Sequence, residues 1–231
     1  MIVTFTEAIL KSLYTVSYGA SKDDVTPVIT RVFITRENDD LIAMATDRYM
    51  VLRGRYRPVD IGDDQKSVRW GSDDYFDGVH VSVKTLKTVL DYVKSIDGEQ
   101  LIELSIDERP VFTVYPTYDR NDVVRFPDHE VHASGKFPPV NKLFPQAQDG
   151  VTIGSPTDAV SLKLDFLTRV NKMVPPYTGK TLPRYEKDVP WRVTHTGTEN
   201  SNKPGPVHLK RLSDALDHEL DALVQPNLLK R

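Results

Sequence analysis

The chain of 231 residues contains no cysteine. Disulfide frameworks and thiolate metal sites are therefore excluded, and a reducing compartment such as the cytoplasm fits this composition. Long apolar runs are also lacking, because no stretch approaches the roughly 18 residues that cross a membrane. The N-terminus opens with the strand-like Met1-Ile2-Val3-Thr4-Phe5 and not with a basic segment before an apolar one. We expect a cytoplasmic protein without a signal peptide or a membrane partner.

An excess of positive charge is missing as well. The 30 lysines and arginines are outnumbered by 33 aspartates and glutamates, which gives a net charge of −3. Proteins that hold nucleic acid by neutralising its phosphates are usually basic. A role on DNA would therefore depend on a local group of cations, or on holding DNA by something other than affinity. Hydrophobic residues make up 39% of the chain, which is enough for the core of one large or two ordinary domains.

Motifs of the common enzyme classes are absent from the sequence: there is no phosphate-binding glycine loop, nucleophile elbow or dinucleotide fingerprint. The nearest approach to a metal site is Asp128-His129-Glu130-Val131-His132. Its histidines are three residues apart, whereas zinc-binding histidines on a helix are four apart, and Pro127 disfavours a helix here. A solvated loop is the favoured interpretation. We predict no catalytic residues, no metal site and no cofactor, and a metal-dependent nucleic-acid enzyme is the weakest alternative.

What the sequence does contain is a repeated order of elements, in which a strand precedes a helix and further strands follow it. Three helices are predicted. The first begins after the cap Thr6, the second spans residues 84–95, and the third begins after the cap Asp165. The predicted strands are short apolar, alternating or β-branched runs: 1–5, 28–35, 41–45, 50–52, 80–83, 101–106, 111–115, 162–164, 191–196, 207–211 and 220–224. The leucines of residues 209–223 also fit a helix, and strand, loop and strand is the favoured interpretation there. Apolar residues 81, 83, 86 and 89 align with residues 162, 164, 167 and 170. The repeat predicts a fold built from one supersecondary module.

A corner between two apolar strands stands out at Leu41–Tyr56. Its apolar runs, Leu41–Ala45 and Met50–Leu52, flank the polar Thr46-Asp47-Arg48. Asp47, and more weakly Thr46, can hydrogen-bond the backbone of the reversal. An ordinary hairpin and the wall of a peptide pocket fit this pattern about equally well.

Basic residues follow two of the predicted helices. Lys84, Lys87 and Lys94 form a stripe beside the apolar residues of the second helix, and Arg169 and Lys172 are placed similarly on the third. A basic helix face is often merely solvated. Because two copies of the module share it, a surface that meets phosphate is the favoured interpretation.

Three stretches together resemble one family, the bacterial sliding clamp, which is the β subunit of the replicative polymerase. Leu41–Tyr56 is similar to the family's Ala-Thr-Asp-Gly-His-Arg-Leu corner. Phe137-Pro138-Pro139-Val140-Asn141-Lys142-Leu143-Phe144-Pro145 is similar to the Phe-Pro-Asp-Tyr-x-x-Leu-Leu-Pro segment that closes the family's middle domain. Leu223-Val224-Gln225-Pro226-Asn227-Leu228-Leu229 resembles its C-terminal apolar-apolar-Met-Pro-Met-Arg-Leu. The three stretches occur in the family's order.

This resemblance implies an α+β DNA-clamp fold, with repeated strand-helix-strands modules and helices on one face of antiparallel sheets. It implies a non-catalytic ring around duplex DNA that tethers DNA polymerase and other clamp-binding peptides through a hydrophobic pocket. Carried over residue by residue, the pocket comprises Thr46, Val51, Pro138, Lys142, Leu143, Leu223 and Gln225. The candidate DNA-facing residues are Lys84, Lys87, Lys94, Arg169 and Lys172.

The chain also departs from the family pattern. It starts where the family's middle domain would, so we predict a clamp domain over residues 1–150 and a shortened second clamp-like domain over 151–231. Two-domain chains need three copies for a six-domain ring, and the chain therefore looks most like a short phage-encoded clamp that forms a homotrimer, with a clamp loader as a further candidate partner. Arg48-Tyr49-Met50 replaces Gly-His-Arg, and Gln225 and Asn227 replace both methionines, so a more polar pocket is expected.

Two further expectations follow from the resemblance. The main alternative to a ring is a clamp-like peptide-binding module that does not encircle DNA. Truncation after Leu220 is expected to abolish peptide binding and to leave the fold of residues 1–150 intact.

Overall fold

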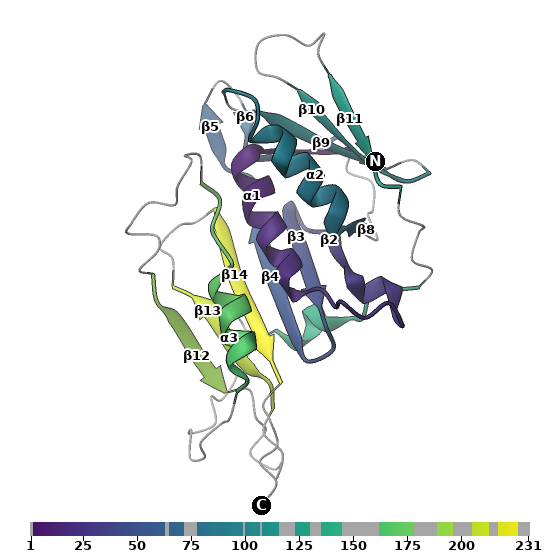
Figure 1. The fold of residues 1–231 in the computed structure, drawn as a ribbon. Helices are drawn as coiled ribbons and strands as arrows, with labels where there is room; N and C mark the ends of the chain where they lie inside the picture. The colour runs from purple at the N-terminus through teal and green to yellow at the C-terminus, as the bar shows by residue number, and fades with distance from the viewer. Residues whose placement is uncertain are drawn as a thin grey trace, which may run out of the picture.

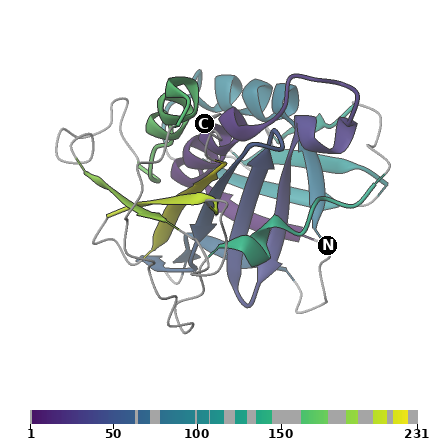
Figure 2. The ribbon, with the colours of Figure 1, turned by 90° about the horizontal axis from the view of Figure 1, so that it is seen from below.

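The structure is a computed structural model, and it describes residues 2–62, 65–71, 78–98, 100–106, 108–115, 123–129, 135–144, 162–177, 189–195, 205–212 and 217–225. Among these residues, three α-helices lie together on one side of antiparallel sheets (Figures 1 and 2). The predicted α+β class, with helices on one face of antiparallel sheets, is confirmed. No helix in the described ranges is long and apolar enough to cross a membrane.

The helices are α1 Glu7–Val16, α2 Val83–Val93 and α3 Leu164–Asn171. Thr6 caps α1 as predicted, because its side chain accepts a hydrogen bond from the N–H of Ile9. Ser82 caps α2 in the same way through Thr85. The cap of α3 is Lys163 and not Asp165, which lies in the first turn, where a carboxylate favours the positive end of the helix dipole. Short 3₁₀ helices are η1 Ser17–Gly19, η2 Pro27–Thr30 and η3 Val140–Leu143.

The strands form two main sheets, with the orders β11-β10-β9-β1-β7 and β12-β13-β14-β4-β3-β2-β8. The first contains β1 Ile2–Thr6, β7 Val68–Trp70, β9 Leu101–Ile106, β10 Pro110–Tyr115 and β11 Val124–Pro127. The second contains β2 Arg31–Glu37, β3 Asp40–Thr46, β4 Met50–Tyr56, β8 Val79–Ser82, β12 Trp191–His195, β13 Val207–Arg211 and β14 His218–Val224. A two-stranded pair joins β5 Asp60–Gly62 to β6 Gln65–Lys66.

The repeated module of the sequence is visible in this topology. We define a module as a helix with the three strands that follow it: α1 with β2–β4, α2 with β9–β11, and α3 with β12–β14. The strand before each of the first two helices joins the sheet of the other module, because β1 pairs with β9 and β8 pairs with β2. The strand predicted over residues 162–164 is wrong at its end, since Leu164 is the first residue of α3.

The second main sheet joins the N-terminal and C-terminal parts of the chain. β14 pairs with β4 along its whole length, from His218 opposite Tyr56 to Val224 opposite Met50. The domain boundary predicted at residues 150 and 151 lies outside the described residues and stays a prediction. What the described residues after it contribute is one module, α3 and β12–β14.

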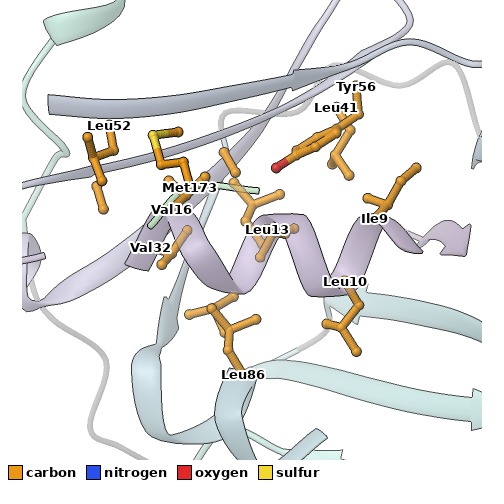
Figure 3. Packing of buried hydrophobic residues seen from close by; sticks show 14 of the residues in the cluster. Ile9, Leu10, Leu13, Val16, Val32, Leu41, Leu52, Tyr56, Leu86 and Met173 are labelled. Atoms are coloured by element: carbon orange, nitrogen blue, oxygen red, sulfur yellow. The ribbon is translucent and has the colours of Figure 1, made fainter. Parts of the chain in front are cut away.

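A hydrophobic core fills the space between the helices and the sheets (Figure 3). Tyr56 is fully buried there, with its hydroxyl 3.1 Å from Ser12 Oγ, and burial raises the pKa of Tyr56. A Cβ atom at Gly54 would collide with the Tyr56 ring, so glycine is required beside it. The apolar residues of α1 are buried in this core: Ile9, Leu10, Leu13 and Val16.

Candidate functional site

The corner between β3 and β4 is built by the side chains that the sequence predicts. Asp47 Oδ1 accepts hydrogen bonds from the N–H groups of Tyr49 (3.0 Å) and Met50 (2.9 Å). The Thr46 hydroxyl donates to the Met50 carbonyl (2.7 Å) and accepts from the Arg48 N–H (3.2 Å). Arg48 has a φ of +79°, in the left-handed region that favours glycine. The corner therefore holds Arg48 and Tyr49 in a fixed, outward-facing reversal.

A cavity of about 300 Å³ opens beside this corner. Six of the seven residues predicted for the pocket line it, and the seventh, Lys142, is exposed on η3 outside the lining. Six further residues complete the wall. The full lining is Ile29, Thr46, Arg48, Tyr49, Met50, Val51, Pro138, Val140, Leu143, Pro206, Leu223 and Gln225. Three stretches far apart in the sequence are thus brought together on one cavity.

Strand pairing explains why these stretches meet. Leu223 of β14 lies directly opposite Val51 of β4, and the Gln225 N–H donates to the Tyr49 carbonyl (2.8 Å). Below the cavity, Val51 and Leu223 pack with the buried ring of Phe144, which follows η3. The apolar floor is therefore shared by β4, β14 and the segment after β11.

A buried ion pair fastens the same three segments. Arg53 Nη2 lies 2.7 Å from Asp221 Oδ2, with side-chain exposures of 8% and 2%. The Arg53 guanidinium also donates to Asn141 Oδ1 (2.8 Å) and stacks 3.8 Å from the centre of the Phe144 ring. Burial raises the pKa of Asp221, but the approach of His208 (3.7 Å) and the charge of Arg53 outweigh burial, so this pKa lies below its ordinary value.

The only charged residue among the described residues that line the cavity is positive. Arg48 lines it and donates to Thr26 Oγ1, and the Lys163 ammonium lies 5.9 Å from the centre of the Tyr49 ring. None of the described lining residues is acidic. Tyr49 and Leu143 are large apolar side chains that remain 60% and 57% exposed. The site can therefore accept apolar side chains beside an anionic group.

Some lining residues gave no signal in the sequence. Ile29 belongs to a stretch predicted as strand, but Pro27 starts the 3₁₀ helix η2 there and turns Ile29 toward the corner. Pro206 immediately precedes β13 and reaches the cavity only because β13 pairs with β14. Such neighbours across a sheet could be found only once the strand order was known.

Four of the five candidate DNA-facing residues are exposed on the helix side of the molecule. Lys84 and Lys87 lie on α2, while Lys94 and Lys172 are the C-caps of α2 and α3. Lys87 is paired with Asp91 one turn on. These exposed lysines are thus distributed over two of the helices on the helix side of the molecule.

Arg169 differs from the four lysines. Its side chain is 19% exposed, pairs with the carboxylates of Asp47 and Asp165, and donates to the Tyr18 carbonyl (3.3 Å). These contacts fasten α3 to the β3–β4 corner. Arg169 therefore has a structural role, and we leave it out of the DNA-facing set.

The Asp128–His132 stretch is only partly described. Asp128 is 3% exposed, and its carboxylate accepts from the Ser82 N–H (2.8 Å) and the Thr85 hydroxyl (3.2 Å) at the start of α2. The solvated-loop interpretation is wrong for this residue, which anchors the helix end. Glu130 and His132 lie outside the described residues. Within the described part of the chain, no three acidic or histidine side chains are grouped to hold a metal.

Comparisons with known proteins find similarity to sliding clamps, in sequence and in fold. No family model matches the chain. The beta sliding clamp of Micrococcus luteus is 24% identical over 132 residues, which cover 57% of this chain and 36% of that protein. Solved structures of the DNA polymerase sliding clamps of Pseudomonas aeruginosa and Bacillus subtilis superpose with TM-scores of 0.54 and 0.53, at 14% and 13% identity.

Coverage of these proteins is unequal. The superpositions cover 99% of this chain, against 67% and 64% of the two solved chains. The chain spans about a third of the length of the curated relative that it matches. In sequence it resembles the bacterial β sliding clamps, and its fold is their DNA-clamp fold.

Proposed function

We propose that this protein is a DNA sliding clamp, a processivity factor that tethers DNA polymerase and other replication proteins to duplex DNA. The single observation that carries the proposal is the cavity shared by the β3–β4 corner, the segment before Phe144 and the end of β14. Six of the residues that the sequence predicts for a peptide pocket line this one cavity. The clamp fold supports the same function.

The cavity suits a short peptide with bulky apolar side chains. Its volume of about 300 Å³ is at the small end of ligand pockets, which is enough for two or three side chains. The exposed Tyr49 and Leu143 offer apolar contact at the mouth. Because Arg48 and Lys163 stand beside it and no described lining residue is acidic, a partner peptide with an aspartate next to its apolar residues fits best.

DNA would be held on the opposite side, by topology more than by affinity. The exposed lysines belong to α2 and α3, which lie on one side of the sheets (Figure 2), and a ring lined by such helices needs only modest positive charge. This explains how a chain of net charge −3 can act on DNA. Closing a ring requires several copies of the chain; their number, predicted as three, stays a prediction, as does a clamp loader as partner.

The pocket is tested by peptide binding. Leu143→Ala removes an apolar side chain that is 57% exposed at the cavity, so the fold should be unaffected. We expect the affinity for a fluorescently labelled polymerase-derived peptide containing Leu and Phe to fall about 5- to 20-fold, by fluorescence anisotropy. Leu101→Ala, a half-exposed leucine of β9 in the other sheet, is the matched control and should bind normally. Equal losses in both variants would contradict this pocket.

Retention on circular and linear DNA distinguishes a ring from the alternative, a peptide-binding module that does not encircle DNA. A closed ring remains on nicked circular DNA at high salt and slides off after linearisation. A module that binds only peptides shows no difference between the two DNA forms. The metal-dependent enzyme is tested by His129→Ala combined with His132→Ala, which should leave peptide and DNA retention unchanged.

A further inference from the structure

The first two modules show how this fold completes itself. Each has a helix that lies beside the other helix, and each sheet gains a fourth strand from the other module, β8 next to β2 and β1 next to β9 (Figure 1). The edges of β2 and β9 are therefore each paired with a strand of the other module. Val32 and Ile34 of β2, which face Val81 and Val79 of β8, are both fully buried.

The third module lacks these neighbours in the described residues. β12 is the last strand of its sheet, and no described strand pairs with its outer edge. The ladder between β4 and β14 is centred on Arg53 opposite Asp221, so it relates the third module to the first by an approximate two-fold axis. Along the successive ladders, Val193 of β12 then corresponds to Ile34 of β2. Ile34 is fully buried, whereas Val193 is 62% exposed.

The helix of the third module is incompletely covered in the same way. Leu10, Leu86 and Leu167 each lie four residues after the N-cap of their helix. Leu10 and Leu86 are 0% exposed, and Leu10 points from α1 toward the side where Leu86 lies (Figure 3). Leu167 is only half-buried, and Leu164 at the start of α3 is 76% exposed. The described contacts of α3 are with η1 and the core, and no described helix lies beside α3 as α2 lies beside α1.

We propose that a second copy of this chain covers this surface, so that the third modules of two copies form one complete two-module unit. The surface consists of the outer edge of β12 with Val193, and the side of α3 with Leu164 and Leu167. The occupant is a second copy because the chain itself shows what covers this surface: another module, related by a two-fold axis. A surface that meets its own copy across a two-fold axis gives a closed, isologous pair.

The outer edge of β12 adds backbone hydrogen-bonding groups to this apolar surface. The outer N–H and C=O groups of β12 can pair with a strand of the second copy, as those of β2 pair with β8. Leu167 of one copy would meet Leu167 of the other near the axis, at the position that Leu10 and Leu86 occupy on the neighbouring helices α1 and α2. Apolar burial and backbone pairing therefore occur at one interface.

This inference rests on the fold and not on the proposed function. A pocket that failed to bind peptides would leave it intact. Joining third modules in pairs requires an even number of copies, whereas the three-copy ring leaves one third module uncovered. Mass therefore separates the two arrangements.

The test is the mass of the full chain in solution, by sedimentation equilibrium from about 0.1 to 100 µM. We expect assemblies containing an even number of 26.2 kDa chains. Val193→Asp should shift the dissociation constant of the pair at least 100-fold, because it places a charge in the interface. Val25→Asp is the matched control, since Val25 is 81% exposed in the loop before η2, and its mass should equal that of the unchanged protein.

A second measurement does not depend on the stability of Val193→Asp. The chain has no cysteine, so Leu167→Cys has a single thiol, which should form a disulfide-linked dimer under mild oxidation. Thr168→Cys, one position away on the exposed face of α3, should cross-link at least tenfold more slowly. A monomer at all concentrations, an assembly of three, an unchanged mass in folded Val193→Asp, or equal cross-linking of the two thiols would overturn the proposal.

Discussion

At the scale of single residues, Arg48 is the position where this corner departs most from the backbone preferences of its side chain. Its φ of +79° costs an L-residue with a Cβ atom about 1 to 2 kcal/mol, and glycine almost nothing. The sequence resemblance already placed a glycine of the clamp family at this position. An arginine here is explained by its place on the wall of the cavity, where it supplies positive charge.

Two substitutions separate the backbone from the guanidinium. Arg48→Gly and Arg48→Ala both lose the hydrogen bond to Thr26, but only glycine removes the Cβ atom. We expect the free energy of unfolding of Arg48→Gly to exceed that of Arg48→Ala by about 0.5 to 1 kcal/mol in urea titrations. Both variants should bind an aspartate-containing peptide more weakly than the unchanged protein, and by similar factors. A more stable alanine variant would mean that the left-handed conformation relaxes on substitution.

The residues of the candidate site could be predicted from the sequence only where motif and geometry coincide. Thr46, Val51, Leu223 and Gln225 were within reach because the resemblance supplied three stretches in a known order. Lys142 was not separable from its neighbour Leu143, because η3 turns one side chain to solvent and the other to the cavity. The direction of a side chain in a single helical turn has no sequence signal of its own.

At the scale of elements, two carboxylates of β14 attach it to the neighbouring part of the chain. Glu219 pairs with Arg57 and Asp221 with Arg53, while Asp217, just before the strand, pairs with its neighbour His218. The pKa of Asp217 lies below its ordinary value chiefly through its hydrogen bond with His218. Burial raises the pKa of Glu219, but Arg57 and Lys210 outweigh burial and the net shift is downward, as for Asp221. Burial raises the pKa of Asp40 on β3 above its ordinary value, so the effect of Asp40 on the pH dependence of stability is opposite.

These shifts predict acid sensitivity. A carboxyl group with a folded-state pKa below its unfolded pKa stabilises the fold fully above the unfolded value, near 4, and loses this contribution as the pH falls through the folded value. We therefore expect the free energy of unfolding, measured in urea, to decrease as the pH falls below about 4.5.

Asp221→Asn provides the control for this pH dependence. At pH 7 it should lower the free energy of unfolding by about 3 to 5 kcal/mol, because it leaves Arg53 buried without its charge partner. The variant should also lose stability less steeply between pH 5 and 3 than the unchanged protein, since one titrating group is gone. The same steepness in both proteins would show that Asp221 does not contribute to the acid transition.

The buried pair also revises one expectation about the C-terminal end. Truncation after Leu220 would remove Asp221 as well as the cavity residues Leu223 and Gln225. Arg53 of β4 would then be left without its counter-ion, so the fold of the preceding part would be destabilised, contrary to the sequence-based expectation. Single substitutions at the cavity mouth, such as Leu143→Ala, avoid this problem.

Elements with strong local signals were predictable, and those defined by long-range pairing were not. α1, α2 and the strands β3, β4, β9 and β10 follow apolar periodicity closely. β7 and β11 are short and mixed in polarity, and they are strands only because β1 and β10 offer them edges. Pro27 shortens β2 at its start by favouring the first turn of η2. Local patterns cannot report which edge a short segment will find.

At the scale of the whole molecule, the two candidate surfaces lie on different parts of the fold. The helices α2 and α3, with their exposed lysines, are on the helix side, whereas η3 lies on the sheet side (Figure 2). The exposed Lys136 precedes η3, and the exposed Lys142 belongs to it. Negative charge elsewhere gives the net −3 of the chain. A protein of this kind should show weak but measurable electrostatic attraction to DNA through one face only.

This arrangement predicts which lysines control the salt dependence of DNA binding. Replacing Lys84 and Lys94 by Gln should reduce the slope of log affinity against log salt by up to about 1.8, because each phosphate contact contributes about 0.9 for duplex DNA. Lys136→Gln with Lys142→Gln makes the same change in net charge on the sheet side, so its slope should stay within error of the unchanged protein. The measurement is fluorescence anisotropy with a labelled duplex over a series of salt concentrations. Equal reductions in both double variants would show that net charge alone, and not the helix face, attracts DNA; a reduction only in the second would place DNA on the sheet side.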